Sequence, residues 1–132
     1  MQTNPGIQTA NTIIYCRRWE KTVRFYRDVF GLRIQLANDW SVEFCLNDRA
    51  RLSIANEKRA AKKSSGGQGI TLALETEDIE AFHAFLKNAG LALPEIKDHP
   101  WEARVFYMRD PEGNRVKIWQ PHCATGKARS QH

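Results

Sequence analysis

The stretch TIIYCRRWEKTVRFYRDVFGL, residues 12–32, decides the fold, because a second stretch of the same kind occurs later in the chain. Residues 71–91, TLALETEDIEAFHAFLKNAGL, align with it without a gap at an offset of 59. Each copy begins with Thr and apolar residues typical of a strand, becomes polar for a few positions, and then shows apolar residues at helical spacing. The alignment predicts a duplicated strand–helix unit.

Both predicted helices have an apolar face and end at a glycine. The apolar faces consist of Trp19, Val23, Tyr26 and Phe30 in the first copy and of Ile79, Phe82, Phe85, Leu86 and Ala89 in the second. Gly31 and Gly90 follow the helices, at a position where a left-handed cap favours a residue without a β-carbon. Asp78 is placed to cap the N-terminus of the second helix, whereas Arg17 and Arg18 offer the first helix no such cap.

Further strand-like segments follow each helix. They cover residues 40–46 and 50–55 after the first, with a turn at Asn47 and Asp48, and residues 91–96, 104–109 and 115–120 after the second, with a DPEGN turn at 110–114. We expect one domain over residues 1–132, made of a βαβββ module at 10–56, a linker at 57–69, a second βαβββ module at 70–121 and a polar tail at 122–132. This predicts an α+β fold in which two four-stranded sheets form a half-barrel cleft, the alternative being a two-layer sandwich whose second copy completes the core.

Length and composition exclude several classes of protein. The chain has 132 residues, of which 42% are hydrophobic and 27% charged, and this is typical of a globular domain rather than of a disordered chain. No apolar run approaches the roughly 18–20 residues that span a bilayer, and the first ten residues lack the pattern of a signal peptide. We therefore expect a cytoplasmic protein. Cys16, Cys45 and Cys123 form no CxxC pair, so neither disulfides nor a thiolate zinc site is indicated.

The formal charge of +5 raises the question of a nucleic-acid partner. The basic residues that cluster in the sequence are Lys58, Arg59, Lys62 and Lys63 in the predicted linker and Lys127 and Arg129 in the tail. The linker also contains Gly and Ser, which is typical of a solvated connection between modules. We therefore expect neither a nucleic-acid partner nor a membrane partner.

Three segments together resemble a known superfamily. They are FYRDVFGL at 25–32, EDIEAFHAFLKNAGL at 77–91 and PWEARVFYMRDPEGNRVKIWQP at 100–121, the last with Asp110, Gly113 and Asn114 in its turn. Over roughly residues 10–121 the chain is similar to the vicinal oxygen chelate superfamily, which includes glyoxalase I, extradiol dioxygenases, and fosfomycin- and bleomycin-resistance proteins. The resemblance implies the glyoxalase/bleomycin resistance fold and, at this size, a homodimer.

The resemblance also identifies the positions that would hold a metal. Enzymes of the superfamily bind a divalent ion through His, Glu or Gln on the inner strand faces. Matched one position at a time, the first-strand ligand falls on Asn11, or on Thr12 with a shift of one residue, and its counterpart in the second module falls on Thr71. The other two fall on Ser53 and Lys117, where an ammonium would repel a dication. The histidines give no substitute site, since they lie on a predicted helix, in a loop and in the tail: His83, His99, His122 and His132. We expect no metal and no cofactor.

Without a metal, the superfamily's reactions have no Lewis acid. Glu43, Glu75 and Asp39 could act as bases, but no complementary acid or nucleophile lies at a recognisable spacing, so no catalytic residue is assigned. The resemblance then favours the metal-free bleomycin-resistance type, which binds a small organic ligand and sequesters an antibiotic or toxin. One alternative is a metal-dependent or metal-free lyase, isomerase or dioxygenase of the same superfamily. Another is an interaction module that docks a partner through the basic loop.

Strand alternation and aromatic content give the candidate ligand-binding residues. The candidates are Asn11, Ile13, Tyr15, Trp40, Phe44, Arg51, Ser53, Thr71, Trp101, Phe106, Lys117 and Trp119. For Trp40, Phe44 and Phe106 a position in the core is the alternative. Arg51 and Lys117 would attract an anionic or carbonyl-rich ligand, whereas bleomycin is cationic. The expected partner is therefore an anionic or aromatic small molecule.

Overall fold

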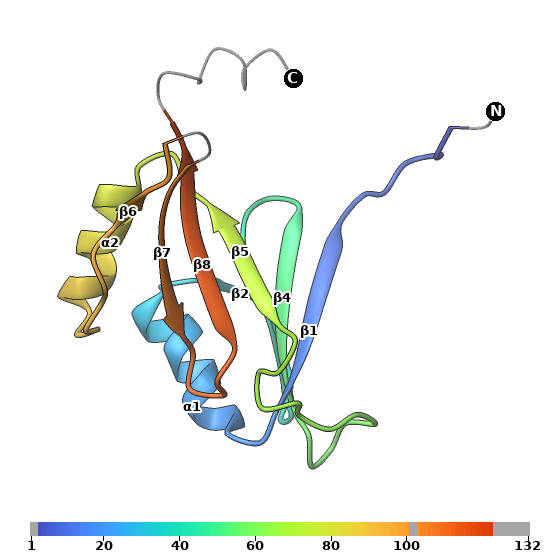
Figure 1. Ribbon diagram of the computed structural model, residues 1–132. Helices are drawn as coiled ribbons and strands as arrows, with labels where there is room; N and C mark the ends of the chain where they lie inside the picture. Colours follow the sequence, from blue (N-terminus) through green and yellow to red (C-terminus); the bar gives the residue numbers. More distant parts are fainter. Residues whose placement is uncertain (1–2, 101–102, 123–132) are drawn as a thin grey trace. The chain divides into compact units, whose positions relative to one another are not determined.

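The computed structural model describes residues 3–100 and 103–122. The chain divides into two compact units, Met1–Gly66 (unit 1) and Gly67–His132 (unit 2), and the boundary falls within the predicted linker (Figure 1). None of the helices in the described residues is long and apolar enough to cross a membrane.

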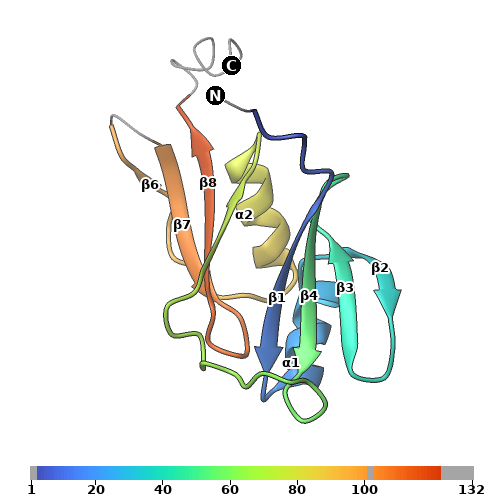
Figure 2. The ribbon, with the colours of Figure 1, turned by 90° about the vertical axis from the view of Figure 1, so that its right-hand side faces the viewer.

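Unit 1 is a four-stranded sheet with one helical segment. Its elements are β1 (Ala10–Cys16), α1 (Trp19–Arg24), the π-helix η1 (Phe25–Val29), β2 (Arg33–Ala37), β3 (Ser41–Cys45) and β4 (Ala50–Asn56). The strand order is β1-β4-β3-β2, with β1 parallel to β4 and the other neighbours antiparallel (Figure 2). The predicted turn at Asn47 is confirmed, since its side-chain oxygen accepts hydrogen bonds from the backbone N–H groups of Arg49 and Ala50.

The core of unit 1 lies between the sheet and its helix. Alternate strand residues point toward the helix and are fully buried, among them Leu52, Ile54 and Phe44. Tyr26 packs on Phe44 with ring centroids 6.3 Å apart. The Trp19 indole N–H donates to the Ile54 carbonyl at 2.8 Å and so ties the start of α1 to β4. Each large apolar side chain buried here contributes about 1.5–3 kcal/mol.

Unit 2 repeats the arrangement of unit 1. Its elements are β5 (Thr71–Glu75), α2 (Ile79–Asn88), β6 (Lys97–Asp98), β7 (Ala103–Arg109) and β8 (Arg115–Pro121). The strand order β5-β8-β7-β6, with β5 parallel to β8, is the order of unit 1 with each strand replaced by its counterpart. The α2 helix lies against one face of the sheet (Figure 2). The predicted duplication of a βαβββ module is therefore present in the topology.

The gapless alignment of the two copies is wrong by one residue. Side chains at even positions of β1 and β5 point toward the helix, as Ile14 and Leu72 do, so an odd offset would match opposite faces of the two strands. The helices begin 60 residues apart, whereas Gly31 and Gly90 lie 59 apart. The extra residue of the first copy is absorbed in η1, where the N–H of Phe30 bonds the carbonyl of Phe25.

The predicted signals at the ends of α2 are confirmed, but its predicted apolar face is only partly buried. The Asp78 carboxylate accepts from the backbone N–H of Ala81 at 3.0 Å, and Gly90 has a φ of 103°. Ile79 and Leu86 are fully buried, whereas Phe85 is 52% exposed. The apolar stripe of α2 is therefore narrower than the sequence predicts.

Two strands differ from the prediction. Residues 91–96 form no strand, and β6 pairs with β7 only through Lys97 and Asp98, because Pro94 has no N–H to donate to a ladder. The sequence analysis missed β2, whose residues are all exposed and whose pairing with β3 is interrupted by a bulge between Ile34 and Leu36. Both are edge strands, whose burial pattern is weak.

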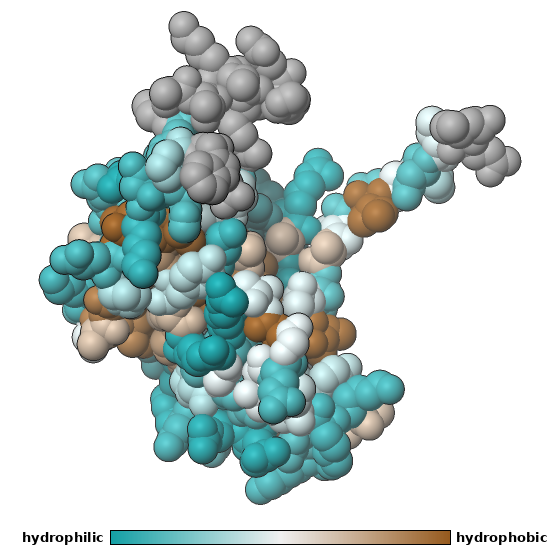
Figure 3. Space-filling model, in the orientation of Figure 1, coloured by the Kyte–Doolittle hydropathy of each residue, from teal (hydrophilic) through white to brown (hydrophobic). Residues whose placement is uncertain are grey.

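The exposed surface seen in Figure 3 is mostly hydrophilic, with apolar patches of limited size.

The DPEGN segment forms a tight turn between β7 and β8. One oxygen of the buried Asp110 carboxylate accepts from the backbone N–H groups of Glu112 and Asn114, at 3.0 and 2.9 Å. The other oxygen accepts from the Asn114 side-chain amide at 2.9 Å. The turn therefore fixes the start of β8, which carries Lys117 and Trp119.

Candidate functional site

Each sheet has a face turned away from the helix of its own unit, here called the distal face. In unit 1 the distal face carries Asn11, Ile13 and Tyr15 of β1, with Arg51 and Ser53 of β4 beside them in register. The helix-facing neighbours Ile14, Leu52 and Ile54 are buried. The structure thus brings five of the predicted residues onto one surface.

Polar groups of the unit 1 distal face interact with one another. The Ser53 hydroxyl donates to the Asn11 side-chain oxygen at 3.0 Å. The guanidinium of Arg51 lies 3.7 Å from the Glu43 carboxylate of β3. Because both side chains of this pair are largely shielded from solvent, the carboxylate offsets the charge of Arg51. Arg51 is therefore a weaker anion anchor than the sequence suggests.

The distal face of unit 2 combines cations with aromatic rings. Thr71, Lys117 and Trp119 lie on this face, together with Tyr107 and Arg115, which the sequence analysis did not select. The Arg115 guanidinium carbon lies 4.2 Å from the centroid of the Tyr107 ring. The Lys117 ammonium lies 6.0 Å from the Trp119 ring. Both geometries fall within the range of cation–π contacts.

Four predicted aromatic residues do not join these surfaces. Phe44 is fully buried on the helix face of unit 1, and Phe106 is 1% exposed on the helix face of unit 2. Trp40 lies in the bend before β3, where its carbonyl accepts from the Asn56 N–H. Trp101 lies outside the described residues. The core alternative thus describes the environment of Phe44, since strand alternation turns it toward Tyr26.

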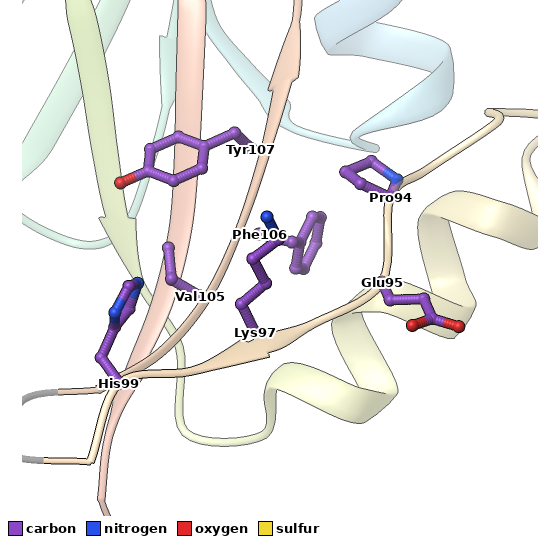
Figure 4. Close-up of a pocket in the computed structure, with 7 residues that line it drawn as sticks. All are labelled: Pro94, Glu95, Lys97, His99, Val105, Phe106 and Tyr107. Carbon is purple, nitrogen blue, oxygen red and sulfur yellow. The ribbon is translucent and has the colours of Figure 1, made fainter.

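A cavity of about 400 Å³ opens at the edge of the unit 2 sheet, where β6 pairs with β7 (Figure 4). It is lined by Pro94, Glu95, Lys97, His99, Val105, Phe106 and Tyr107. Of these, the sequence analysis selected Phe106 alone. The missed residues lie on β6, on β7 and in the segments on either side of β6. Their sequence signal is the spacing of Val105 and Tyr107 on one face of β7.

A family model matches residues 8–118, and its description is Glyoxalase/Bleomycin resistance protein/Dioxygenase superfamily. The chain belongs to this superfamily. The match covers the first βαβββ module and the second as far as the middle of β8, and the α+β fold agrees with it.

The chain is also similar to individual known proteins. The uncharacterized protein YraH of Bacillus subtilis (strain 168) is 29% identical over 115 residues, which cover 77% of this chain and 89% of that protein. Among solved structures, the antibiotic binding protein TnmS3 of Streptomyces sp. CB03234 is similar with a TM-score of 0.72, 21% identity, and coverage of 92% of this chain and 100% of that one. A lactoylglutathione lyase of Agrobacterium tumefaciens is similar with a TM-score of 0.71, 19% identity, and coverage of 89% and 96%. At these identities the two structures show the shared fold.

The superfamily's metal positions carry a donor set that does not fit a divalent ion. Asn11 and Ser53 hydrogen-bond to each other, Thr71 offers one neutral hydroxyl, and the ammonium of Lys117 has no lone pair. Within residues 3–100 and 103–122, no three His, Cys, Asp or Glu side chains lie close enough together to hold a metal ion.

Proposed function

We propose that the protein binds a small organic molecule, anionic or aromatic, without the help of a metal ion. The observation that carries the proposal is the distal face of unit 2, where Arg115 and Lys117 lie beside the rings of Tyr107 and Trp119. Neither cation takes part in a salt bridge with any residue that the structure describes. An anionic group would supply the missing counter-charge, and the rings would supply apolar contact.

The donor set at the metal positions supports the metal-free part of the proposal. A Lewis acid would have to be held by an amide, two hydroxyls and an ammonium, which is a poor set for any divalent ion. Sequestration of a ligand involves no reaction step that a Lewis acid would have to catalyse. We extend to this chain the role of an antibiotic binding protein, which is how the similar Streptomyces structure is described. Sequestration of an antibiotic or toxin is then the proposed form of this activity.

Metal content and ligand binding together test the proposal. Protein purified without a chelator is expected to contain far less than one equivalent of zinc, nickel, manganese or iron by elemental analysis. A panel of aromatic acids, neutral aromatics and antibiotics is then screened by thermal shift, because a ligand that binds only the native state raises its unfolding free energy. Stoichiometric metal whose removal abolishes ligand binding would refute the metal-free proposal.

The role of Lys117 is tested with a matched pair of variants. Lys117→Gln is expected to weaken the binding of the best anionic ligand by about tenfold, since a charge-assisted hydrogen bond is replaced by a neutral one. Lys87→Gln removes the same charge from the last turn of α2, on the other face of the unit 2 sheet, and is expected to leave the affinity unchanged. Equal affinities of the two variants would count against Lys117. The homodimer stays a prediction of the resemblance, which light scattering tests, and the cytoplasmic location stays a prediction from the hydropathy of the sequence.

A further inference from the structure

The cavity at the edge of the unit 2 sheet suggests where the ligand binds and what it is. We infer that this cavity, lined by Pro94, Glu95, Lys97, His99, Val105, Phe106 and Tyr107, binds an aromatic carboxylic acid, with the ring in the cavity and the carboxylate at Lys97. The inference rests on the proposed function and adds to it a site and a chemical class: Tyr107 of the distal face also lines this cavity, and for an aromatic acid bound here Lys97, and not Lys117, holds the carboxylate.

The size and lining of the cavity suit a small aromatic ring. Its volume of about 400 Å³ lies at the lower end of the range of small-molecule sites, which run from roughly 300 to 1,000 Å³. Val105, Phe106 and Tyr107 are consecutive residues of β7 that all line the cavity, with Val105 and Tyr107 on one face of the strand and Phe106 on the other. Aromatic walls favour a planar apolar ligand through stacked or edge-to-face contacts.

The charge of the cavity comes from Lys97. Figure 4 shows its side chain extending from β6 toward the rings of Phe106 and Tyr107, while the carboxylate of Glu95 points away from them. Lys97 forms no salt bridge within the described part of the chain. The Lys97 ammonium can form a charge-assisted hydrogen bond with a carboxylate, which is stronger than a hydrogen bond with a neutral amide. This charge therefore favours an acid over its neutral amide.

Residues outside the cavity contact the residues that line it and so fix their positions. His83 of α2 is hydrogen-bonded through Nε2 to the Pro94 carbonyl at 2.8 Å, and its ring packs edge-on against Phe106 with centroids 4.9 Å apart. Arg115 stacks on Tyr107. These contacts fix two aromatic walls and the segment that enters β6, as a preformed binding site requires.

The β6 side of the cavity is fixed in a similar way. The His99 N–H donates to the Ala103 carbonyl at 2.8 Å, and the His99 carbonyl interacts with Nε2 of His122. The same nitrogen lies 3.1 Å from the Asp98 carboxylate. His122 thus holds both residues that follow Lys97, although β6 itself has only two residues paired with β7. This arrangement gives structural roles to His83 and His122, which the sequence analysis placed on a helix and in the tail.

The experiment compares 1-naphthoate with its neutral isostere 1-naphthamide by isothermal titration. We expect the wild type to bind 1-naphthoate at least about tenfold more tightly than the amide, and Lys97→Gln to remove that preference while Lys97→Arg retains it. Lys97 is exposed, so neither variant is expected to disturb folding. Lys87→Gln is the control for a lost positive charge. Backbone amide NMR shifts on titration should be largest at residues 95–99 and 105–107.

The outcomes separate this inference from the function on which it rests. If 1-naphthoate binds and Lys117→Gln weakens it while Lys97→Gln does not, the cavity assignment is overturned and metal-free binding stands. The same holds if 1-naphthoate fails to bind while another panel ligand stabilises the protein in a Lys117-dependent way. If ligand binding depends on a bound metal, the proposed function falls, whatever Lys97 does.

Discussion

The Asp110 carboxylate holds the turn that leads into β8, and its replacement by Ala tests that role. The carboxylate accepts three hydrogen bonds of 2.9–3.0 Å, two from backbone N–H groups of the turn and one from the Asn114 side chain. Asp110 is 5% exposed and Asn114 is fully buried, so water does not readily replace the lost acceptor. Asp110→Ala would leave three donors without their partner.

The expected loss of stability follows from these contacts. A buried donor without an acceptor costs about 1–3 kcal/mol, and because the three share one site we expect Asp110→Ala to lower the free energy of unfolding by about 3–5 kcal/mol in total. Asp110→Asn should cost about 1–2 kcal/mol. The remaining oxygen can still serve the two backbone N–H groups, and the new amide can donate to the Asn114 side-chain oxygen after that side chain rotates. At present this oxygen is buried and has no partner among the described residues.

Urea unfolding monitored by circular dichroism measures the two losses, with the midpoint and the slope both reported. Asp48→Ala, in the exposed hairpin turn of unit 1, is the control and should change stability by less than about 0.5 kcal/mol. The reasoning is refuted if Asp110→Ala and Asp110→Asn lose the same stability, because the carboxylate oxygens would then not be what holds the turn.

Two further changes test the packing on which the candidate site depends. Gly66 and Gly67 both have positive φ, but a β-carbon at Gly67 would lie 2.1 Å from the Gly113 carbonyl oxygen whereas one at Gly66 meets nothing within 4 Å. In thermal melts Gly66→Ala should therefore cost about 1–2 kcal/mol and Gly67→Ala about 1–3 kcal/mol more, and equal costs would argue against the close approach. Trp19→Phe removes the hydrogen bond to Ile54 and should cost about 1 kcal/mol in urea unfolding, whereas no loss would mean that water replaces the bond.

The fold could be predicted largely from the sequence because its signals are local. Helical spacing, the Asp78 cap and the glycines after the helices are properties of short segments, and the structure confirms them. The alignment of the two copies was wrong by one residue because it too was based on the pattern of short segments. The extra residue of the first copy lies in η1, and no residue type there distinguishes a π-helix from an α-helix in the sequence.

The candidate site could be predicted only in part, because side chains on a sheet are placed by register as well as by alternation. Alternation correctly put Asn11 and Ser53 on one face, and Thr71 and Lys117 on one face. It could not show that Glu43 would lie beside Arg51, since strand pairing sets that contact. It also could not place Phe44, because an aromatic residue in a strand is equally suited to a binding wall and to a core.

The two copies of the module have diverged in how they use the same surface. In unit 1 the distal face satisfies its own polar groups, with Ser53 on Asn11 and Glu43 beside Arg51. In unit 2 the corresponding strands carry Arg115 and Lys117, which contact aromatic rings and no carboxylate in the described residues. A face that satisfies itself gains little from a ligand, whereas a face with unpaired cations gains a counter-charge. Ligand recognition is therefore expected to depend far more on unit 2, and charge-removing variants there should lower affinity more than Arg51→Gln does.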